Sequence, residues 1–292
     1  MPRYIARRYN GKEDLEKMQD LVARTMDIYS HLHPGDIAWQ RFQHPGSDEE
    51  WLTYMIENGN ELVAFAWLEP PEDLWLCVNP ANPEATDEII DIFASGRSGN
   101  TLSIEIMETE EHIISELPGK GFRELKEGPF YARMYLDLAN LPEAELPEGF
   151  SARHIDIDRD FERRVDLHRK VWNPSKVTYE SYRNVTRTPP YTPRLDWVIE
   201  SPEGDFASYC LLWPDRESGI GLFEPVGTSP EFRRMGLSRA VCISAMREYR
   251  KMGGTGVEVN SRGDSGRPAP AKLYQSIGFR AIARTRKFVR QC

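Results

Sequence analysis

The sequence predicts an α+β fold with mixed β-sheets, built from two similar units in tandem. Three observations indicate this fold. Strand and helix patterns alternate along the 292 residues, motifs of the first half recur in the same order in the second, and an acidic Pro-rich segment separates the halves. The length suffices for two ordinary domains, and 40% hydrophobic residues are enough for packed cores.

The repeat begins at the first strand of each half. Residues 4–7 (Tyr-Ile-Ala-Arg) resemble residues 150–153 (Phe-Ser-Ala-Arg). Each is followed by an acidic amphipathic stretch suited to a helix, at 14–26 and at 160–172.

A strand-turn-strand pattern comes next in each half and predicts two hairpins, 54–57 with 62–68 and 197–200 with 206–213. Gly-Phe-Arg then precedes a terminal strand in both halves, at 121–123 and 278–280. Coincidence between short peptides is the alternative, but the shared order and spacing favour duplication. We expect a first unit at 1–140, a linker at 141–149 and a second unit at 150–292.

Composition excludes several classes of protein. A net charge of −9 and a pI near 5.3 argue against a general nucleic-acid binder, and no apolar run is long enough to cross a membrane. The four cysteines lack metal or redox spacing, and the N-terminus does not resemble a signal peptide, so we expect a cytoplasmic protein. His31 and His33 suggest a loop pair more than a metal site.

The most informative segment begins at residue 222. A strand at 222–228 is followed by a turn with two arginines and a glycine, and then by an amphipathic helix at 237–252. The first turn of a helix leaves N–H groups unpaired and favours an anion, and Gly236 would admit a phosphate without a Cβ in its way. An ordinary amphipathic helix with a basic start is the alternative for this segment alone.

The residues downstream favour the phosphate site. A strand at 256–260 and a short helix at 270–277 follow, and the helix ends at Gly278. The runs Glu-Pro-Val-Gly-Thr-x-Pro-x-x-Arg-Arg-x-Gly-Leu, from Glu224, and Ala-x-Leu-Tyr-x-x-x-Gly-Phe, from Ala271, resemble the acetyl-CoA-binding core of the GNAT family of N-acetyltransferases. The resemblance is close over about the last 70 residues and weak in the first unit.

The resemblance implies acetyl-CoA as co-substrate and assigns residues to it. The pyrophosphate loop corresponds to Arg233, Arg234, Met235, Gly236, Leu237 and Ser238, and the strand that pairs with the pantetheine arm corresponds to Val226, Gly227 and Thr228. Ser238 departs slightly from the Gly or Ala of the family. Arg267 stands where an asparagine is common, which puts one pantetheine contact in doubt.

Two side chains are candidates for the chemistry. Tyr274 matches the tyrosine that the family often places near the CoA sulfur, where its hydroxyl could protonate the departing thiolate; a core tyrosine is the alternative. Glu224 lies two residues before Val226, on the same strand face, and is our candidate for receiving the amine proton. A structural hydrogen-bond role is the alternative for Glu224, and Glu258 is a second candidate for the base.

The first unit lacks this equipment. Residues 83–93 contain neither arginine nor glycine but four carboxylates, and Leu117 stands where the second unit has Tyr274. The resemblance therefore implies one active unit, which we expect to transfer an acetyl group to a primary amine of a small molecule or peptide, by direct attack in a ternary complex. An acyl-CoA-binding sensor or scaffold without efficient transfer is the rival. We expect the acceptor pocket around 172–193, with contributions from the first unit.

Overall fold

The computed structural model describes residues 4–95, 101–264, 266 and 268–291. The first unit contains β1 (Ile5–Arg8), α1 (Lys12–Thr25), α2 (Pro34–Phe42), α3 (Ser47–Glu50), β2 (Leu52–Asn58), β3 (Glu61–Glu69), β4 (Asp73–Val78), α4 (Ala85–Ala94), β5 (Thr101–Met107), α5 (Glu111–Ile114), β6 (Arg123–Leu125) and β7 (Tyr131–Asp137). The second contains β8 (Ser151–His154), α6 (Ile157–Val171), α7 (Tyr179–Val185), β9 (Asp196–Glu200), β10 (Phe206–Pro214), β11 (Ile220–Thr228), α8 (Leu237–Lys251), β12 (Gly256–Arg262), α9 (Pro268–Ile277) and β13 (Arg280–Gln291). The α+β prediction is confirmed, and the predicted helices and hairpins agree with this element order within a few residues.

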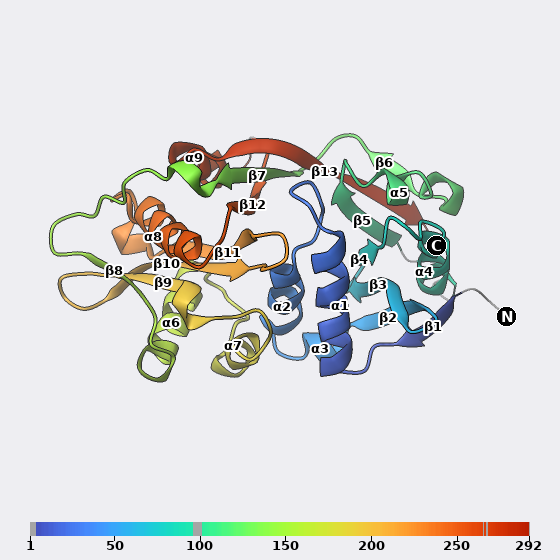
Figure 1. Cartoon of the computed structure of the whole chain (residues 1–292), viewed down its shortest axis with the longest axis horizontal. Helices are drawn as coiled ribbons and strands as arrows, with labels where there is room; N and C mark the ends of the chain where they lie inside the picture. Colours follow the sequence, from blue (N-terminus) through green and yellow to red (C-terminus); the bar gives the residue numbers. More distant parts are fainter. Residues whose placement is uncertain (1–3, 96–100, 265, 267, 292) are drawn as a thin grey trace.

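The strands form one mixed sheet that runs through both units (Figure 1). Its order is β1-β2-β3-β4-β5-β13-β7-β12-β11-β10-β9-β8, with β6 beside β13. Only two neighbouring pairs are parallel among the described residues, β4 with β5 and β11 with β12. The order within each half is the same when read from its outer edge, so the sheet repeats the duplication seen in the sequence.

The two units exchange their last strands. β7 precedes the linker, yet it pairs with β12 and β13, and Gly256 opposes Asp137 in this register. β13 begins beside β7 and continues into the first unit, where residues 285–291 pair with β5. Figure 1 shows β13 as a long strand that bridges the two units. The ladder hydrogen bonds of this exchange hold the units together.

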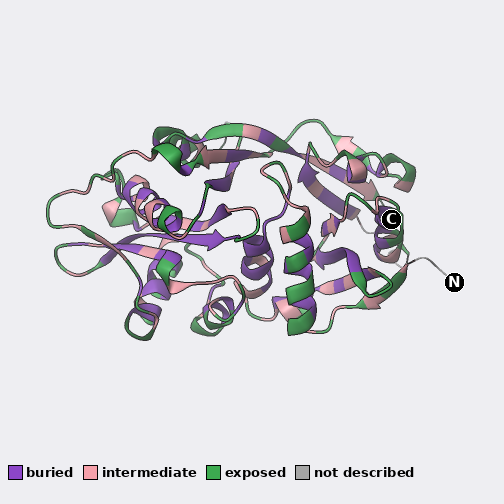
Figure 2. Ribbon diagram, viewed as in Figure 1, coloured by how far each residue is buried: buried purple, intermediate pink, exposed green. Residues whose placement is uncertain are grey.

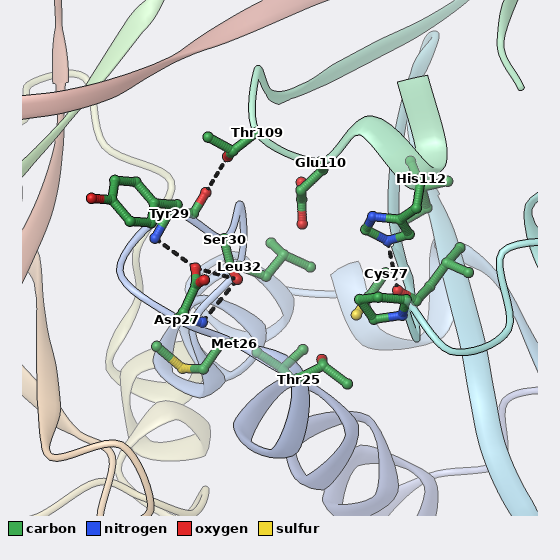
Figure 3. Close-up of a pocket in the computed structure, with 14 residues that line it drawn as sticks. Thr25, Met26, Asp27, Tyr29, Ser30, Leu32, Cys77, Thr109, Glu110 and His112 are labelled. Carbon is green, nitrogen blue, oxygen red and sulfur yellow. Dashed lines mark hydrogen bonds between the residues drawn. The ribbon is translucent and has the colours of Figure 1, made fainter. Parts of the chain in front are cut away.

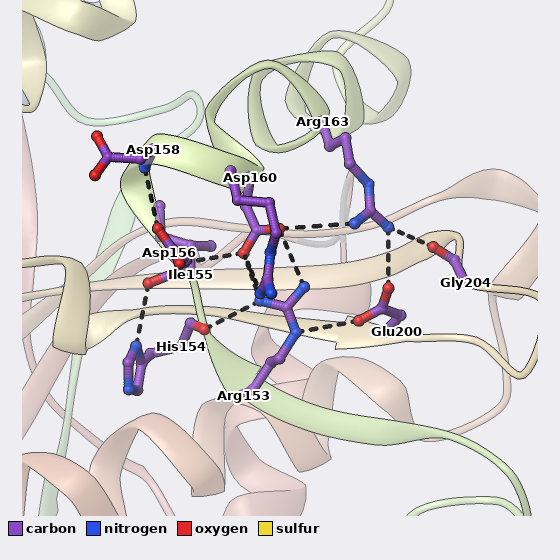
Figure 4. A network of polar contacts seen from close by, with 10 residues as sticks. Arg153, His154, Ile155, Asp156, Asp158, Asp160, Arg163, Glu200 and Gly204 are labelled. Carbon is purple, nitrogen blue, oxygen red and sulfur yellow. Dashed lines mark hydrogen bonds and ion pairs between the residues drawn. The ribbon is translucent and has the colours of Figure 1, made fainter.

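The duplication is also present in side chains. Arg153 forms ion pairs with Asp160 on α6 (2.5 Å) and with Glu200 on β9 (3.1 Å), and the network extends to Arg163 (Figure 4). The aligned residues of the first unit form the same triad, because Arg7 pairs with Asp14 (2.6 Å) and with Glu57 (2.7 Å). Each triad joins the first strand, the first helix and the second strand of its unit.

Helix α2 belongs to the first unit but packs on the second. Its Trp39 is buried in a cluster with Tyr182 of α7 and Trp213 of β10. Gly35 permits this approach, since a Cβ there would lie 2.4 Å from Trp213. Figure 1 shows α1 and α2 between the two units, and Figure 2 shows α1 with one buried and one exposed face. The first unit therefore contributes a helix to the neighbourhood of β11.

Residues 141–150 connect the units without forming a helix or strand. The division of the chain at 141–149 stays a prediction, because the exchanged strands place β7 of the first segment in the second half of the sheet. In the described part of the chain no helix is both long and apolar enough to span a membrane. Cys77, Cys210 and Cys242 are free thiols, and Cys292 lies outside the described residues.

Candidate active site

The site is centred where β11 and β12 separate. These parallel strands pair only from Ile220 to Leu222 of β11, opposite residues 256–258 of β12. β11 then continues to Thr228, and β12 continues to Arg262. The edge of β11 beyond Leu222 consequently faces an opening instead of a paired neighbour. Such an edge can accept an extended ligand as an added strand, as predicted for Val226, Gly227 and Thr228.

Glu224 lies on β11 just inside this opening. It is half-buried, and Val226 and Thr228 share its partial exposure, while the intervening residues are buried. This alternation agrees with the predicted common face of Glu224 and Val226. Glu224 lines two neighbouring cavities of about 530 and 650 Å³, so its carboxylate can meet a ligand from either.

The environment of Glu224 raises the affinity of its carboxylate for a proton. Burial, together with the charge of Asp36, raises the pKa of Glu224 to about 8. Asp36 comes from α2 of the first unit, and burial raises its own pKa to about 6. A carboxylate with a raised pKa accepts a proton more readily than an ordinary glutamate does, as a general base requires.

Asp36 is held in place by the cap of α2. The Asp36 carboxylate accepts a hydrogen bond from the His33 N–H (2.9 Å), and His33 Nδ1 accepts one from the Gly35 N–H (2.9 Å). His33 Nε2 also lies 3.1 Å from the Ile220 carbonyl oxygen at the start of β11. His33 therefore acts as a helix cap that ties the two units together at the site. The structure gives His33 a role for which the sequence suggested only a loop.

The predicted phosphate loop lies at the N-terminus of α8. Gly236 has φ +79° and is the N-cap; a Cβ there would meet no atom within 4 Å. No side chain within the described part of the chain caps this helix, so its first N–H groups are available for an anion. Arg233 and Arg234 are exposed, and neither forms an ion pair within the described ranges. These features would admit a pyrophosphate close to the backbone at Gly236.

The loop is joined to β11 through hydroxyl groups. Ser238 Oγ lies 2.5 Å from Thr228 Oγ1, which in turn lies 2.8 Å from Ser208 Oγ on β10. Ser238, which departs from the family pattern, therefore uses its hydroxyl group for a hydrogen bond to Thr228 of β11. Met235 is exposed on the loop and Leu237 is buried below it. Gly227 is closely packed, since a Cβ there would lie 2.7 Å from Val171.

Tyr274 lies on α9 in the core of the second unit. Its side chain is 6% exposed, and its ring packs edge-on against Phe279 with centroids 5.5 Å apart. Burial raises the pKa of Tyr274 well above 10, with a smaller effect from the charge of Glu224, so the phenol keeps its proton. Its assignment as the acid stays a prediction. Arg267 lies outside the described residues.

Glu258, the second candidate base, lies in a different setting. It is fully buried on β12 and forms an ion pair with Arg133 of β7. Burial raises the pKa of Glu258 to about 8, which the charge of Arg133 opposes. It lines none of the cavities described above, so Glu224 is the better placed carboxylate.

The equivalent place in the first unit is different. β4 and β5 pair only at Asp73 and Ser103, so the same opening exists, but Glu84 occupies the N-cap of α4 and carboxylates follow in its first turn. Leu117 is buried where the second unit has Tyr274. A cavity of about 250 Å³ lies beside β4 (Figure 3), where His112 Nε2 lies 3.0 Å from the Val78 carbonyl oxygen. The charge at α4 opposes phosphate binding.

Known proteins share this architecture. No family model matches the chain. A tandem GNAT protein from the clavulanic acid biosynthesis pathway has TM-score 0.63 at 15% identity, over 98% of both chains. A GCN5-related N-acetyltransferase from Sphaerobacter thermophilus has TM-score 0.60 at 18% identity, over 100% of this chain and 96% of that one. Mycothiol acetyltransferase from Thermobispora bispora is 25% identical over 252 residues, or 77% of this chain and 79% of the relative. The chain has the tandem GNAT fold of these proteins. The GNAT family implies acetyl-CoA as the co-substrate.

The sequence predicted a contribution of the first unit to the acceptor pocket but not the residues that make it. Asp36 and Glu69 line a cavity together with Glu224, and Asn260 of β12 faces the same space. No local motif marks these residues, because each is brought to the site by the packing of one unit on the other. The start of the segment expected to form the acceptor pocket, 172–193, lies near Glu224, since residues 171–177 line the second cavity.

Proposed function

We propose that the second unit transfers the acetyl group of acetyl-CoA to a primary amine by direct attack in a ternary complex. The observation that carries the proposal is the opening between β11 and β12. Glu224 lies on β11 beside this opening, and Thr228 at the end of β11 is hydrogen-bonded to Ser238 at the start of α8. The cofactor loop and the candidate base are therefore on one continuous segment.

Bound acetyl-CoA supplies a thioester whose carbonyl carbon an amine can attack. We assign the pyrophosphate to the loop 233–238 and the pantetheine arm to Val226, Gly227 and Thr228. Glu224 accepts the proton that the amine loses as the C–N bond forms. Tyr274 donates its hydroxyl proton to sulfur as the C–S bond breaks. The first unit, including α2, shapes the acceptor cleft in this proposal.

The test is amine-dependent release of CoA. The chain is incubated with acetyl-CoA and a panel of primary amines, and free thiol and acetylated product are measured. We expect release that depends on the amine and a product that gains one acetyl group. Tight acetyl-CoA binding without release for any amine would instead support the sensor or scaffold. A cytoplasmic location remains our proposal from the sequence.

A further inference from the structure

The cavity between the two units carries a strong excess of negative charge. We name this space of about 530 Å³ the interdomain cavity. Five carboxylates line it, from α2, β3, β4, β5 and β11: Asp36, Glu69, Asp73, Glu105 and Glu224. Among the described residues that line it, Lys287 of β13 is the one ammonium, and its Nζ lies 3.6 Å from Asp73. The formal excess is four negative charges (five minus one).

Nearby arginines offset this excess only in part. The charge of Arg133 acts on Asp36 and that of Arg262 acts on Glu105, but Arg133 forms its ion pair with the buried Glu258, and Arg262 forms one with Asp264. Burial raises the pKa of Glu69 and of Glu105, as it does for Glu224. A cation in the cavity would favour the ionised forms of all these carboxylates.

Two buried polar atoms on the cavity wall also lack partners. His31, 8% exposed, has no hydrogen bond at Nδ1 within the described residues, and Asn260 Oδ1 is likewise unpaired there. Burial lowers the pKa of His31 to about 3, so its ring is neutral and adds no positive charge. An unpaired buried acceptor is costly. Asn260 Oδ1 is an acceptor, and so is His31 Nδ1 when the ring proton is on Nε2, so the N–H groups of an ammonium would satisfy both atoms.

Aromatic rings complete the wall. Trp75 of β4 and Trp172 after α6 line the interdomain cavity, and the His31 and Trp75 rings have centroids 5.7 Å apart. Trp75 Nε1 donates a hydrogen bond to Glu69 (3.0 Å), which fixes that carboxylate at the wall. Thr285 Oγ1 likewise donates a hydrogen bond to Glu105 Oε1 (2.5 Å). Carboxylates and indole faces together are suited to alkylammonium groups.

We propose that the interdomain cavity binds an acceptor with a second cationic group besides the reacting amine, namely an aliphatic diamine or polyamine. Glu224 meets the amine that is acetylated, and Glu69 and Glu105 of the first unit bind the distal ammonium. An acceptor with its own carboxylate, such as a free amino acid, is repelled by the same wall. This inference rests on the proposed acetyl transfer and gives the first unit a role in specificity.

The first test compares matched acceptors on the unmodified protein. Linear α,ω-diamines of increasing length are compared with amino alcohols of equal length, in which a hydroxyl replaces the distal amine. We expect kcat/KM to be at least about tenfold higher for the best diamine than for its amino alcohol, as for a hydrogen bond to a charged group. Equal kcat/KM for the two series would overturn the inference while leaving acetyl transfer established.

The second test removes charge without removing hydrogen bonds. In Glu69→Gln and Glu105→Gln an amide oxygen can still accept from Trp75 or Thr285. We expect each variant to lower the preference for diamine over amino alcohol about tenfold. Glu203→Gln, at an exposed turn between β9 and β10, is the control and should keep the wild-type preference. An unchanged preference in both test variants would refute the assignment.

Calorimetric titration with each linear α,ω-diamine of the series, without acetyl-CoA, separates this inference from the proposed function. Binding that weakens in Glu69→Gln and Glu105→Gln supports the cationic site, even if no amine is acetylated and the transferase proposal fails. Acetylation of amines with no detectable diamine binding, and no preference for diamines, overturns the cationic site alone. Thermal melts of all variants confirm that each is folded.

Discussion

Replacing Glu224 with glutamine tests the assignment of the base. The substitution keeps the size of the side chain and removes its ability to take a proton. The pKa of Glu224 is raised to about 8, so the ionised base is present above that pH and is lost as the pH falls. About one-tenth of the carboxyl is ionised at pH 7 and about one-hundredth at pH 6, from that pKa. We therefore expect an acid limb in kcat/KM near pH 8.

In Glu224→Gln the amine must lose its proton to solvent before it attacks. An alkyl amine with a pKa of about 10 is only about one-thousandth unprotonated at pH 7. We expect the variant to be about 10²-fold slower at pH 7, with an acid limb that moves to the pKa of the amine. Affinity for acetyl-CoA should stay nearly the same, because the Glu224 side chain lies outside the phosphate loop.

The assay uses two acceptor amines whose pKa values differ, with kcat/KM measured across pH for both proteins. The wild-type limb should lie at the same pH for both amines, and the variant limb should follow each amine. Limbs that follow the amine in both proteins would show that solvent removes the proton. Loss of acetyl-CoA affinity in step with activity would show that Glu224 is structural.

Three further substitutions address its surroundings and the fold. Burial raises the pKa of Glu224, and the charge of Asp36 raises it further. Asp36→Asn removes that charge, so the acid limb of kcat/KM should move to lower pH. An unmoved limb would show that Asp36 does not affect the pKa of the base. Tyr274→Phe should lower kcat about 10²-fold in steady-state kinetics and leave the melting temperature unchanged; unaltered kcat would eliminate the acid role. Asp160→Asn removes a buried carboxylate from ion pairs with partly exposed arginines and should cost about 1–3 kcal/mol in urea unfolding, whereas Asp158→Asn, exposed on the same helix, should cost little. Equal costs for these two would show that the triad does not stabilise the unit.

Local patterns in the sequence were enough to predict the second unit. The strand before Thr228, the glycine turn and helix α8 are encoded by consecutive residues, and the structure has them at nearly the predicted bounds. Hydrophobic periodicity and a glycine with positive φ determine such elements over short distances. The aligned triads around Arg7 and Arg153 show that the faint repeat reflects a shared structure.

The relation between the units was not predictable in this way. The pairing of β13 with both β7 and β5 depends on register between segments more than 140 residues apart. Nothing in the residues beside Asp36 indicates that α2 packs against β11, because the partner surface is formed by the other unit. The first-unit residues that line the interdomain cavity were not predicted for the same reason. The residues of a site that two units share can therefore be identified only from the structure.

Calorimetric titration of the intact chain with acetyl-CoA tests most directly the claim that only the second unit is active. One equivalent should bind, and Gly236→Glu should abolish binding, because a charged side chain would occupy the phosphate position. Gly59→Glu is the matched control, since Gly59 also has a positive φ and open surroundings but lies in the β2–β3 turn; it should bind like the wild type. Two equivalent sites per chain, or unchanged affinity in Gly236→Glu, would contradict the claim.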